Sequence, residues 1–209
     1  PSYLKKQPET IKGTGNAILP EGTKVTWKMA TKATDNVEWK DSKTMFPFSK
    51  SEDNFVLSKN IFQNTEYQIL TSNAKVQNYE KLNYQISVIK DQFPVIKVET
   101  VPDSLNAGKN YVLGQISDDY GLSKLQVVYY EKDRPKTEKR GVISVKSNVF
   151  DQFVFAFPSN LPVTQGVSYE YYFEVFDNDA IHNFKSTKSV VFSNRILTNQ
   201  EKEDIVFQE

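Results

Sequence analysis

The sequence has no cysteine and a single histidine, and each shortage removes a class of chemistry. Without cysteine there is no disulfide bond, no thiol nucleophile and no cysteine-based zinc site, while the redox compartment stays open. A catalytic triad or an imidazole-bound metal would have to use His182, but zinc needs three or four ligands and a triad needs a nucleophile on a strained turn. His182 lies in a polar stretch between two expected strands, so we interpret it as a loop residue.

Long apolar runs and an excess of charge of one sign are also missing. No run approaches the roughly 18 residues of a transmembrane helix, and no signal peptide opens the chain. Lysine plus arginine and aspartate plus glutamate balance at 26 each and are interspersed, which creates no field to attract nucleic acid or an anionic membrane. We therefore expect no nucleic-acid partner and no direct membrane insertion by this chain.

The two ends of the sequence predict a piece of a longer protein. It begins at Pro1 rather than at methionine, and Thr198 with Glu201 forms a capping box, the pattern that opens an α-helix. Only about three turns of helix fit before the sequence ends. We expect that helix to continue in the parent protein.

Residues 167–179 carry the pattern around which we expect the fold to be organised. Every second residue from Val167 to Val175 is apolar or aromatic, and the residues between them begin with Ser168 and Glu170. A period of two is typical of a strand with one buried face. Because such a row of large side chains needs a second sheet to cover it, the pattern favours a β-sandwich.

Short alternating segments fill the rest of the chain at intervals of roughly 8 to 12 residues, as in immunoglobulin-like sandwiches. We expect Trp27 and Trp39 in a core, and the basic segment 132–140 as a solvated connection, because acidic residues and a proline interrupt it. The expected strands are 1–4 (an edge strand that kinks near residues 13–15), 23–29, 37–39, 44–48, 54–57, 66–71 and 82–89, then 95–101, 110–117, 122–131, 141–146, 152–157, 167–176 and 187–192.

A domain boundary is predicted at residues 91–94. Pro94 cannot donate to a sheet ladder, so the pattern of strands breaks there. Phe93 is a large apolar side chain that a solvated linker would not favour, and we expect it to be buried between the two modules. The predicted fold class is all-β: two tandem immunoglobulin-like or fibronectin III-like β-sandwiches at 1–92 and 93–197, with a short C-terminal helix beginning within 198–209.

Two tyrosines occupy matching places in the two halves. Tyr67 and Tyr169 each lie near the start of the penultimate strand expected in their module. In immunoglobulin-like sandwiches a tyrosine at this place folds its hydroxyl back onto the backbone, an arrangement called the tyrosine corner. We assign this structural role to both residues.

Three segments together resemble a family of bacterial envelope proteins of unknown function: residues 84–94, which include Phe93 and Pro94, residues 117–122, and residues 171–179. The resemblance covers nearly the whole chain. It implies membrane-spanning helices before tandem immunoglobulin-like domains, a location on the periplasmic side of the inner membrane, and a long helical region afterwards. The family brings no catalytic motif, so the resemblance implies an architecture and a location but no activity.

Carboxylates are the only metal-ligand candidates in this sequence. Asp177 and Asp179 follow the strand at 167–176, and Asp118 and Asp119 precede Gly121. Neither group has the spacing of an EF-hand loop, and both are typical of turns in which aspartate bonds its own backbone. We expect turns and no metal or other cofactor, although the metal interpretation would gain if both pairs met at one end of the second module.

Exposed aromatic residues are the remaining candidates for a binding site. Tyr172 and Phe176 lie on the predicted outer face of the strand at 167–176 and are the interaction candidates. The favoured function is a non-enzymatic structural spacer or protein-interaction segment of an envelope protein, whose partner is another protein or neighbouring domains of the same chain. The alternative is a carbohydrate-binding module that uses exposed aromatic residues, and a hydrolase is the remote one.

Overall fold

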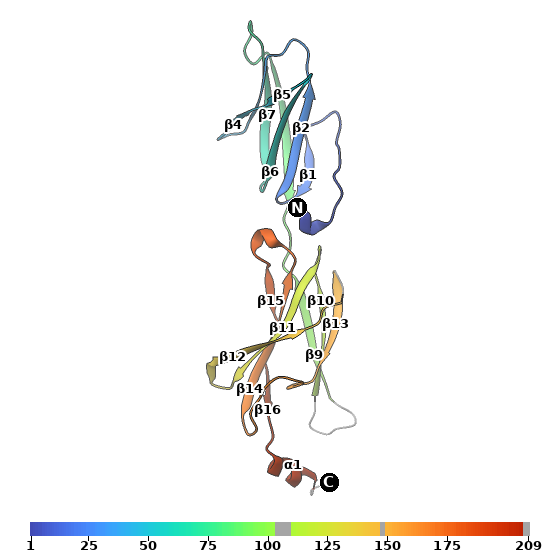
Figure 1. Ribbon diagram of the computed structural model, residues 1–209, viewed down its shortest axis with the longest axis vertical. Helices are drawn as coiled ribbons and strands as arrows, with labels where there is room; N and C mark the ends of the chain where they lie inside the picture. Colours follow the sequence, from blue (N-terminus) through green and yellow to red (C-terminus); the bar gives the residue numbers. More distant parts are fainter. Residues whose placement is uncertain (103–109, 147–148, 207–209) are drawn as a thin grey trace. The chain divides into compact units, whose positions relative to one another are not determined.

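The computed structural model describes residues 1–102, 110–146 and 149–206. The chain separates into two compact units, Pro1–Asp91 and Gln92–Glu209, so the division falls one residue before the predicted boundary. Each unit is built from β-sheets, with little helix (Figure 1). The predicted all-β fold class is confirmed.

In the described residues, the first unit has eight strands in two sheets. A five-stranded sheet has the order β1-β8-β7-β3-β4, and a three-stranded sheet has the order β2-β6-β5. The second sheet follows the order of strands B, E and D of an immunoglobulin sandwich, and β3, β7 and β8 follow C, F and G. The elements are η1 (Ser2–Leu4), β1 (Ala17–Pro20), β2 (Thr23–Ala30), β3 (Asn36–Lys40), β4 (Met45–Pro47), β5 (Ser49–Ser51), β6 (Asn54–Ile61), β7 (Thr65–Ser72) and β8 (Glu80–Ile89).

The second unit pairs a sheet of order β13-β10-β9 with a sheet of order β12-β11-β14-β15, and β16 also pairs with β14. This is the order of a fibronectin III-like sandwich, and β14 is the central strand that the alternating pattern predicted. The elements are β9 (Val95–Pro102), β10 (Asn110–Ser117), β11 (Leu122–Glu131), β12 (Arg134–Ile143), β13 (Phe150–Phe155), β14 (Ser168–Asp177), η2 (Ala180–His182), β15 (Ser186–Lys188), β16 (Phe192–Arg195) and α1 (Asn199–Val206).

Two predicted strands and one predicted connection were wrong. Residues 1–4 are a 3-10 turn rather than an edge strand, and the chain first joins a sheet at Ala17, where β1 runs parallel to β8. Most of the basic segment 132–140 is strand β12, because an edge strand tolerates charged residues and a proline. The strand predicted at 187–192 is divided into β15 and β16. Lys188 pairs with Glu174 and Phe192 pairs with Tyr171, so three residues of this segment lie between the two pairs where β14 has only two. The extra residue forms a bulge.

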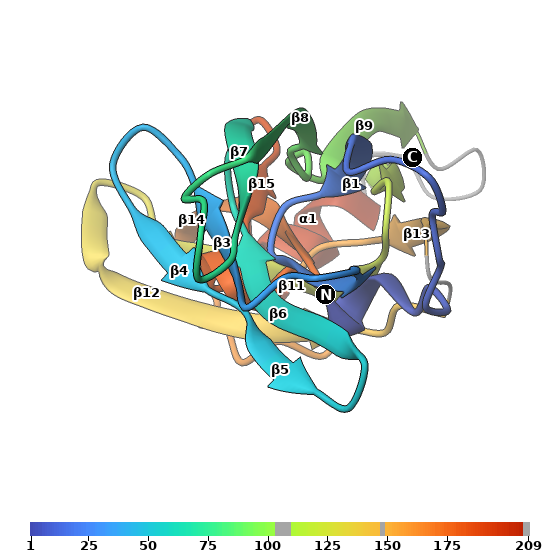
Figure 2. The same ribbon diagram turned by 90° about the horizontal axis from the view of Figure 1, so that it is seen from above.

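The β11–β12 hairpin extends beyond the other strands of the second unit, as Figures 1 and 2 show. Its tip is a two-residue turn at Lys132 and Asp133, and Asp133 has a positive φ of 64°. An ion pair of 2.5 Å joins Arg134 to Glu131 across the turn. The exposed, mostly polar composition explains why the sequence pattern suggested a connection.

Aromatic rings dominate the core of the first unit. Trp39 is 1% exposed and stacks on Tyr67 with ring centroids 5.3 Å apart, and Trp27 packs edge-on against the same tyrosine, so the prediction of two core tryptophans is confirmed. Lys59 lies on the inner row of β6, with its Nζ 3.5 Å from the Trp39 ring centre and 3.8 Å from that of Phe46. Burial lowers the pKa of Lys59, and the Asp41 carboxylate opposes this shift.

The core of the second unit is built around the inward row of β14. Tyr171 and Phe173 pack with Phe155, Phe157 and neighbouring rings at centroid distances of 4.5 to 6.2 Å. Gly114 lies opposite Phe153 in the β10–β13 ladder, and a Cβ added there would lie 2.1 Å from a carbon of the Phe153 ring. Glycine is therefore required at this place by the close approach of an aromatic ring.

Phe93 was predicted to be buried and is 63% exposed, which corrects that prediction. Pro94 is buried instead. The reason is the alternation of an extended chain: Ile96 and Val98 of β9 face the core of the second unit, Pro94 is in phase with them, and Phe93 is in phase with exposed Val95.

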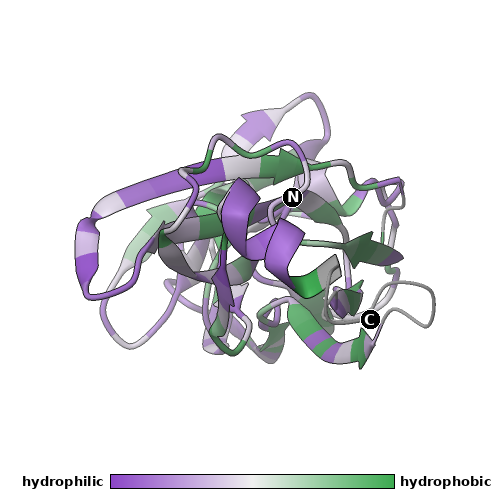
Figure 3. Ribbon diagram, turned by 90° about the horizontal axis from the view of Figure 1, so that it is seen from below, coloured by the Kyte–Doolittle hydropathy of each residue, from purple (hydrophilic) through white to green (hydrophobic). Residues whose placement is uncertain are grey.

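The C-terminal helix α1 begins with the predicted capping box. Glu201 Oε2 accepts from the Thr198 N–H at 2.8 Å, and Thr198 Oγ1 accepts from the Glu201 N–H at 3.2 Å. The bond from the Thr198 N–H and the bond from Arg195 hold the pKa of Glu201 at about 2. The helix is hydrophilic over most of its length (Figure 3), and among the described residues no helix is long and apolar enough to cross a bilayer. Residues 207–209 lie outside the described residues.

The two tyrosines assigned to corners make different hydrogen bonds. The hydroxyl of Tyr169 accepts from the backbone N–H of Thr164, five residues upstream, at 3.0 Å. The hydroxyl of Tyr67 instead donates to the carbonyl of Gly15 at 2.5 Å and accepts from Nε1 of Trp27 at 2.8 Å. Tyr67 therefore fastens the segment before β1 rather than the turn that precedes its own strand.

We expect Tyr169→Phe to lower the free energy of unfolding of the second unit by about 1 kcal/mol, because the Thr164 N–H loses its partner in a part-buried place. Tyr172→Phe, on the opposite face of β14, should change it by much less. Both tryptophans lie in the first unit, so tryptophan fluorescence in a urea titration follows the unfolding of that unit alone. Far-UV circular dichroism follows the unfolding of both units, and the difference between the two curves gives the second unit. Equal losses in the two variants would contradict this assignment of faces.

Alkaline pH should destabilise the second unit through Tyr171. Burial raises the pKa of Tyr171 to about 12, whereas an exposed tyrosine titrates near 10. Because the pKa is higher in the folded state, the unfolded chain loses the Tyr171 proton first as the pH rises. The stability of the second unit is therefore unaffected by Tyr171 below about pH 10 and falls by about 2 kcal/mol between about pH 10 and 12. Urea titrations across this range should show a shallower loss in Tyr171→Phe than in wild type or Tyr172→Phe, and identical slopes would contradict the assignment.

Candidate functional site

The interaction candidates lie together on one surface of the second unit. Because Tyr171, Phe173 and Val175 of β14 face the core, the alternating residues point outward from the sheet β12-β11-β14-β15. We call this surface the aromatic face. It is formed by Lys124, Gln126, Val128 and Tyr130 of β11, Arg140 and Val142 of β12, Glu170, Tyr172, Glu174 and Phe176 of β14, and Ser186 and Lys188 of β15.

A buried carboxylate lies at the centre of the aromatic face. Glu174 is 8% exposed although it points away from the core. Gln126 donates from Nε2 to Oε2 of Glu174 at 2.9 Å, and the Ser186 hydroxyl donates to Oε1 at 2.9 Å. Both carboxylate oxygens are therefore bonded, and three strands are joined through one side chain.

The two aromatic candidates flank this carboxylate, and each has an ammonium group near its ring. Lys188 Nζ lies 5.1 Å from the ring centre of Tyr172, and Lys124 Nζ lies 5.4 Å from that of Phe176. Both rings are half-buried. Cation–π contacts at exposed sites contribute about 0.5–1 kcal/mol each.

Tyr130 and Arg140 extend the aromatic face toward the hairpin. Burial and the neighbouring Glu170 carboxylate raise the pKa of the Tyr130 hydroxyl, so it is a neutral donor at physiological pH. Arg140 donates to Glu138 at 2.6 Å with its side chain still 58% exposed. Tyrosine and arginine are the residue types most enriched where proteins bind one another tightly.

Only part of this surface was predictable. Tyr172 and Phe176 stand out because they are aromatic residues at outward positions of a strand. Gln126, Ser186 and Arg140 were missed, because they come from three other strands and meet β14 only through the strand register. A sequence pattern of period two shows which face a residue is on but does not show what lies beside it.

The predicted turns form at one end of the second unit. Asp118 Oδ2 accepts from the backbone N–H groups of Tyr120 and Gly121 at 2.9 and 2.7 Å. Burial raises the pKa of Asp118, and the charges of Asp119 and Asp177 add to that effect, while the backbone bonds oppose it. The two aspartate pairs therefore approach each other, which is the arrangement that would favour a metal.

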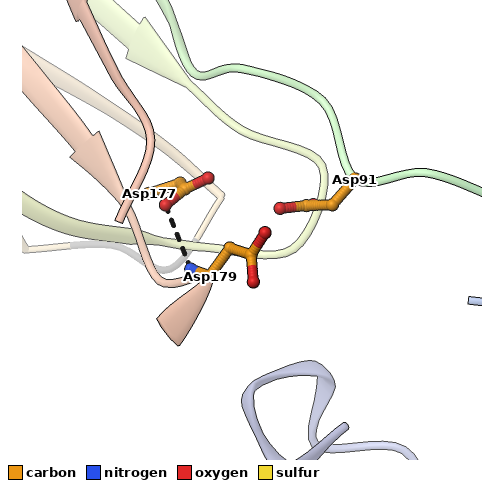
Figure 4. Close-up of side chains that lie close together, drawn as sticks. All are labelled: Asp91, Asp177 and Asp179. Carbon is orange, nitrogen blue, oxygen red and sulfur yellow. Dashed lines mark hydrogen bonds between the residues drawn. The ribbon is translucent and has the colours of Figure 1, made fainter. Parts of the chain in front are cut away.

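A lysine holds the second aspartate pair. Asp177 Oδ1 accepts from the Asp179 N–H at 3.0 Å, as Figure 4 shows. Lys185 Nζ lies 2.6 Å from Asp179 Oδ2 and 3.4 Å from Asp177 Oδ2, with both carboxylates fully buried. His182 also contacts Asp179 through Nδ1. The Lys185 ammonium thus supplies the positive charge that a metal ion would bring, and these aspartates serve as an internal ion-pair network.

A shallow hollow of about 570 Å³ lies on the first unit and was not predicted. Its lining includes Lys40, Glu66, Gln68, Asn83 and Gln85, with a hydrogen bond of 2.8 Å between the two amide side chains of Gln68 and Asn83. Most of the side chains that line it come from β3, β7 and β8, and Asn16, Asp41 and Ser42 from the adjoining loops complete it. It holds none of the interaction candidates.

Comparisons with known proteins return only distant structural matches. No family model matches the chain, and no curated protein matches it. The fibronectin(III)-like modules of Clostridium thermocellum CbhA match at 12% identity over 90% of this chain and 91% of that chain, with a TM-score of 0.29. A DUF3823 family protein from Bacteroides ovatus matches at 11% identity over 81% and 97%, also at 0.29. The architecture of this chain therefore rests on its own strand order.

We expect Lys185→Met to lower the free energy of unfolding of the second unit by about 3 kcal/mol, because it leaves two buried carboxylates without their cation. Lys188→Met, at an exposed position three residues further along the chain on β15, is the matched control and should cost less than about 1 kcal/mol. Denaturant titrations measure both. A melting temperature of the wild type that rises with added calcium, and no longer does so in Asp177→Asn, would contradict this interpretation in favour of a metal site.

Proposed function

We propose that this chain is a non-enzymatic structural spacer and protein-interaction segment of a larger bacterial envelope protein, on the periplasmic side of the inner membrane. Two β-sandwich units in one chain suit that role, since each has its own hydrophobic core. The location rests on the resemblance of residues 84–94, 117–122 and 171–179 to an envelope family.

The single observation that carries the interaction role is the aromatic face. It combines Tyr130, Tyr172 and Arg140 with a carboxylate, Glu174, whose bonds are already complete. A protein partner could cover this centre without leaving a carboxylate oxygen of Glu174 without a hydrogen bond, which is a usual cost of docking on a charged surface. The rim carries charges of both signs, so the expected partner is a folded protein surface or a neighbouring domain rather than a polyanion.

A carbohydrate is a poorer fit to the same surface. Sugar stacking requires open aromatic rings that lie together, whereas Tyr172 and Phe176 are four residues apart on one strand, about 14 Å. Glu174 lies between them, and a lysine ammonium lies near each ring. The hollow on the first unit has polar side chains but none of these rings.

Site-specific photo-cross-linking in cells that make the parent protein tests the proposal. A photoreactive residue in place of Tyr172 should yield discrete protein adducts, and Arg140→Glu should reduce them severalfold. The matched control is the same residue in place of Thr26, an exposed outward position of β2 in the first unit. Equal adducts from both positions, or binding to a glycan panel that is lost in Tyr172→Ala, would contradict the protein-interaction role.

A further inference from the structure

Strand β9 is an open edge of the second unit. In the described part of the chain it pairs with β10 alone, through eight consecutive partners from Val95 to Pro102 without a bulge. The other side of such a strand presents a row of backbone N–H and C=O groups, which can pair with a further strand. β9 therefore offers the backbone chemistry of strand addition.

Most other sheet edges of the described residues carry a feature that blocks such pairing. The exceptions are β13 and β2, and the exposed charges of β2, Lys24 and Lys28, have the same sign and would repel those of a second copy. Strands β1, β4 and β5 have only three or four residues each, and β12 is charged and contains Pro135. The edge formed by β15 and β16 contains the extra residue described above. Short edges, charges, prolines and bulges are the known protections against edge pairing, and β9 has only the charged pair Lys97 and Glu99 along its length.

That charged pair is complementary to itself. The outward residues of β9 are Val95, Lys97, Glu99 and Val101, all exposed. If a second copy of β9 runs antiparallel with Val98 opposite Val98, then Lys97 faces Glu99 and Val95 faces Val101, each pair occurring twice. Opposite charges and apolar side chains that lie directly across from each other stabilise a sheet by about 0.2–1 kcal/mol per pair.

The same residues exclude the neighbouring registers. A shift that moves the centre to Lys97 places the two Lys97 side chains opposite each other, and a shift to Glu99 does the same with the two glutamates. Like charges directly opposite are destabilising. Sliding one strand by a single residue would place Val98 of one copy opposite Lys97 or Glu99 of the other. The core-facing residues of the second copy would then lie on the outer side of the sheet. One register is therefore favoured.

We propose that β9 is a self-association edge, through which two copies of this chain pair β9 to β9 and form one continuous sheet of order β13-β10-β9-β9-β10-β13. The occupant is a second copy because the charge pattern is symmetric about Val98. The paired strands are short and the interface is small, so association is weak, with a dissociation constant of about 0.01–1 mM. Such a contact acts when the parent proteins are concentrated side by side.

A charge-swap experiment on the full chain tests this inference. Sedimentation velocity from about 10 µM to about 1 mM should show a reversible dimer for wild type. Lys97→Glu alone places glutamate opposite glutamate, and Glu99→Lys alone places lysine opposite lysine, so each variant should weaken the dimer at least about tenfold. An equimolar mixture of the two variants should dimerise again, because every cross-strand pair then has opposite signs, and the double variant should behave like wild type.

Lys28→Glu, an exposed change of the same kind on β2 of the first unit, should leave the dimer unaffected. Restoration on mixing cannot arise from misfolding, so the outcome does not depend on how each substitution changes stability. The inference is overturned if wild type stays monomeric over this range, if the single variants dimerise as well as wild type, or if mixing them restores nothing. A monomer that instead binds an extended peptide along β9 also overturns it.

Discussion

The burial of one face of β14 is the constraint on which the second unit depends. Its inward row supplies Tyr171, Phe173 and Val175 to the core, and its outward row is set by the same alternation. Because the inward residues of β14 are fixed by the core, the residues between them must all lie on the outer face of the sheet. On the outward row, Glu174 lies between the aromatic residues Tyr172 and Phe176. Its buried carboxylate is stable there because Gln126 and Ser186 donate hydrogen bonds to it.

The first strand of each unit pairs differently at the edge of its sandwich. In the first, β1 adds in parallel to β8, and Tyr67 fastens the preceding segment through Gly15, where a Cβ would lie 2.5 Å from the hydroxyl. In the second, β9 stays with β10 on the other sheet, and the edge of the last strand carries an extra residue. The internal likeness of the halves thus extends to their cores and not to the edges of their sheets.

Charge is used inside this protein as well as on its surface. Lys59 packs its ammonium against Trp39 and Phe46 in one unit, and Lys185 joins two buried aspartates in the other. Each lysine would be costly to bury alone, and each is compensated by a different partner, π-electrons in one case and carboxylates in the other. Both arrangements depend on residues from separate strands, so neither was evident as a sequence motif.

The sequence by itself determined the fold class, the central strand β14 and the capping box of α1. These follow from local periodicity and local hydrogen bonding, which neighbouring residues decide. Only the tertiary structure decided that Phe93 is exposed, that residues 134–143 form an edge strand, and that Gln126, Glu174 and Ser186 meet. Those outcomes depend on strand register and on which strand lies at an edge, and pairing between distant segments sets both.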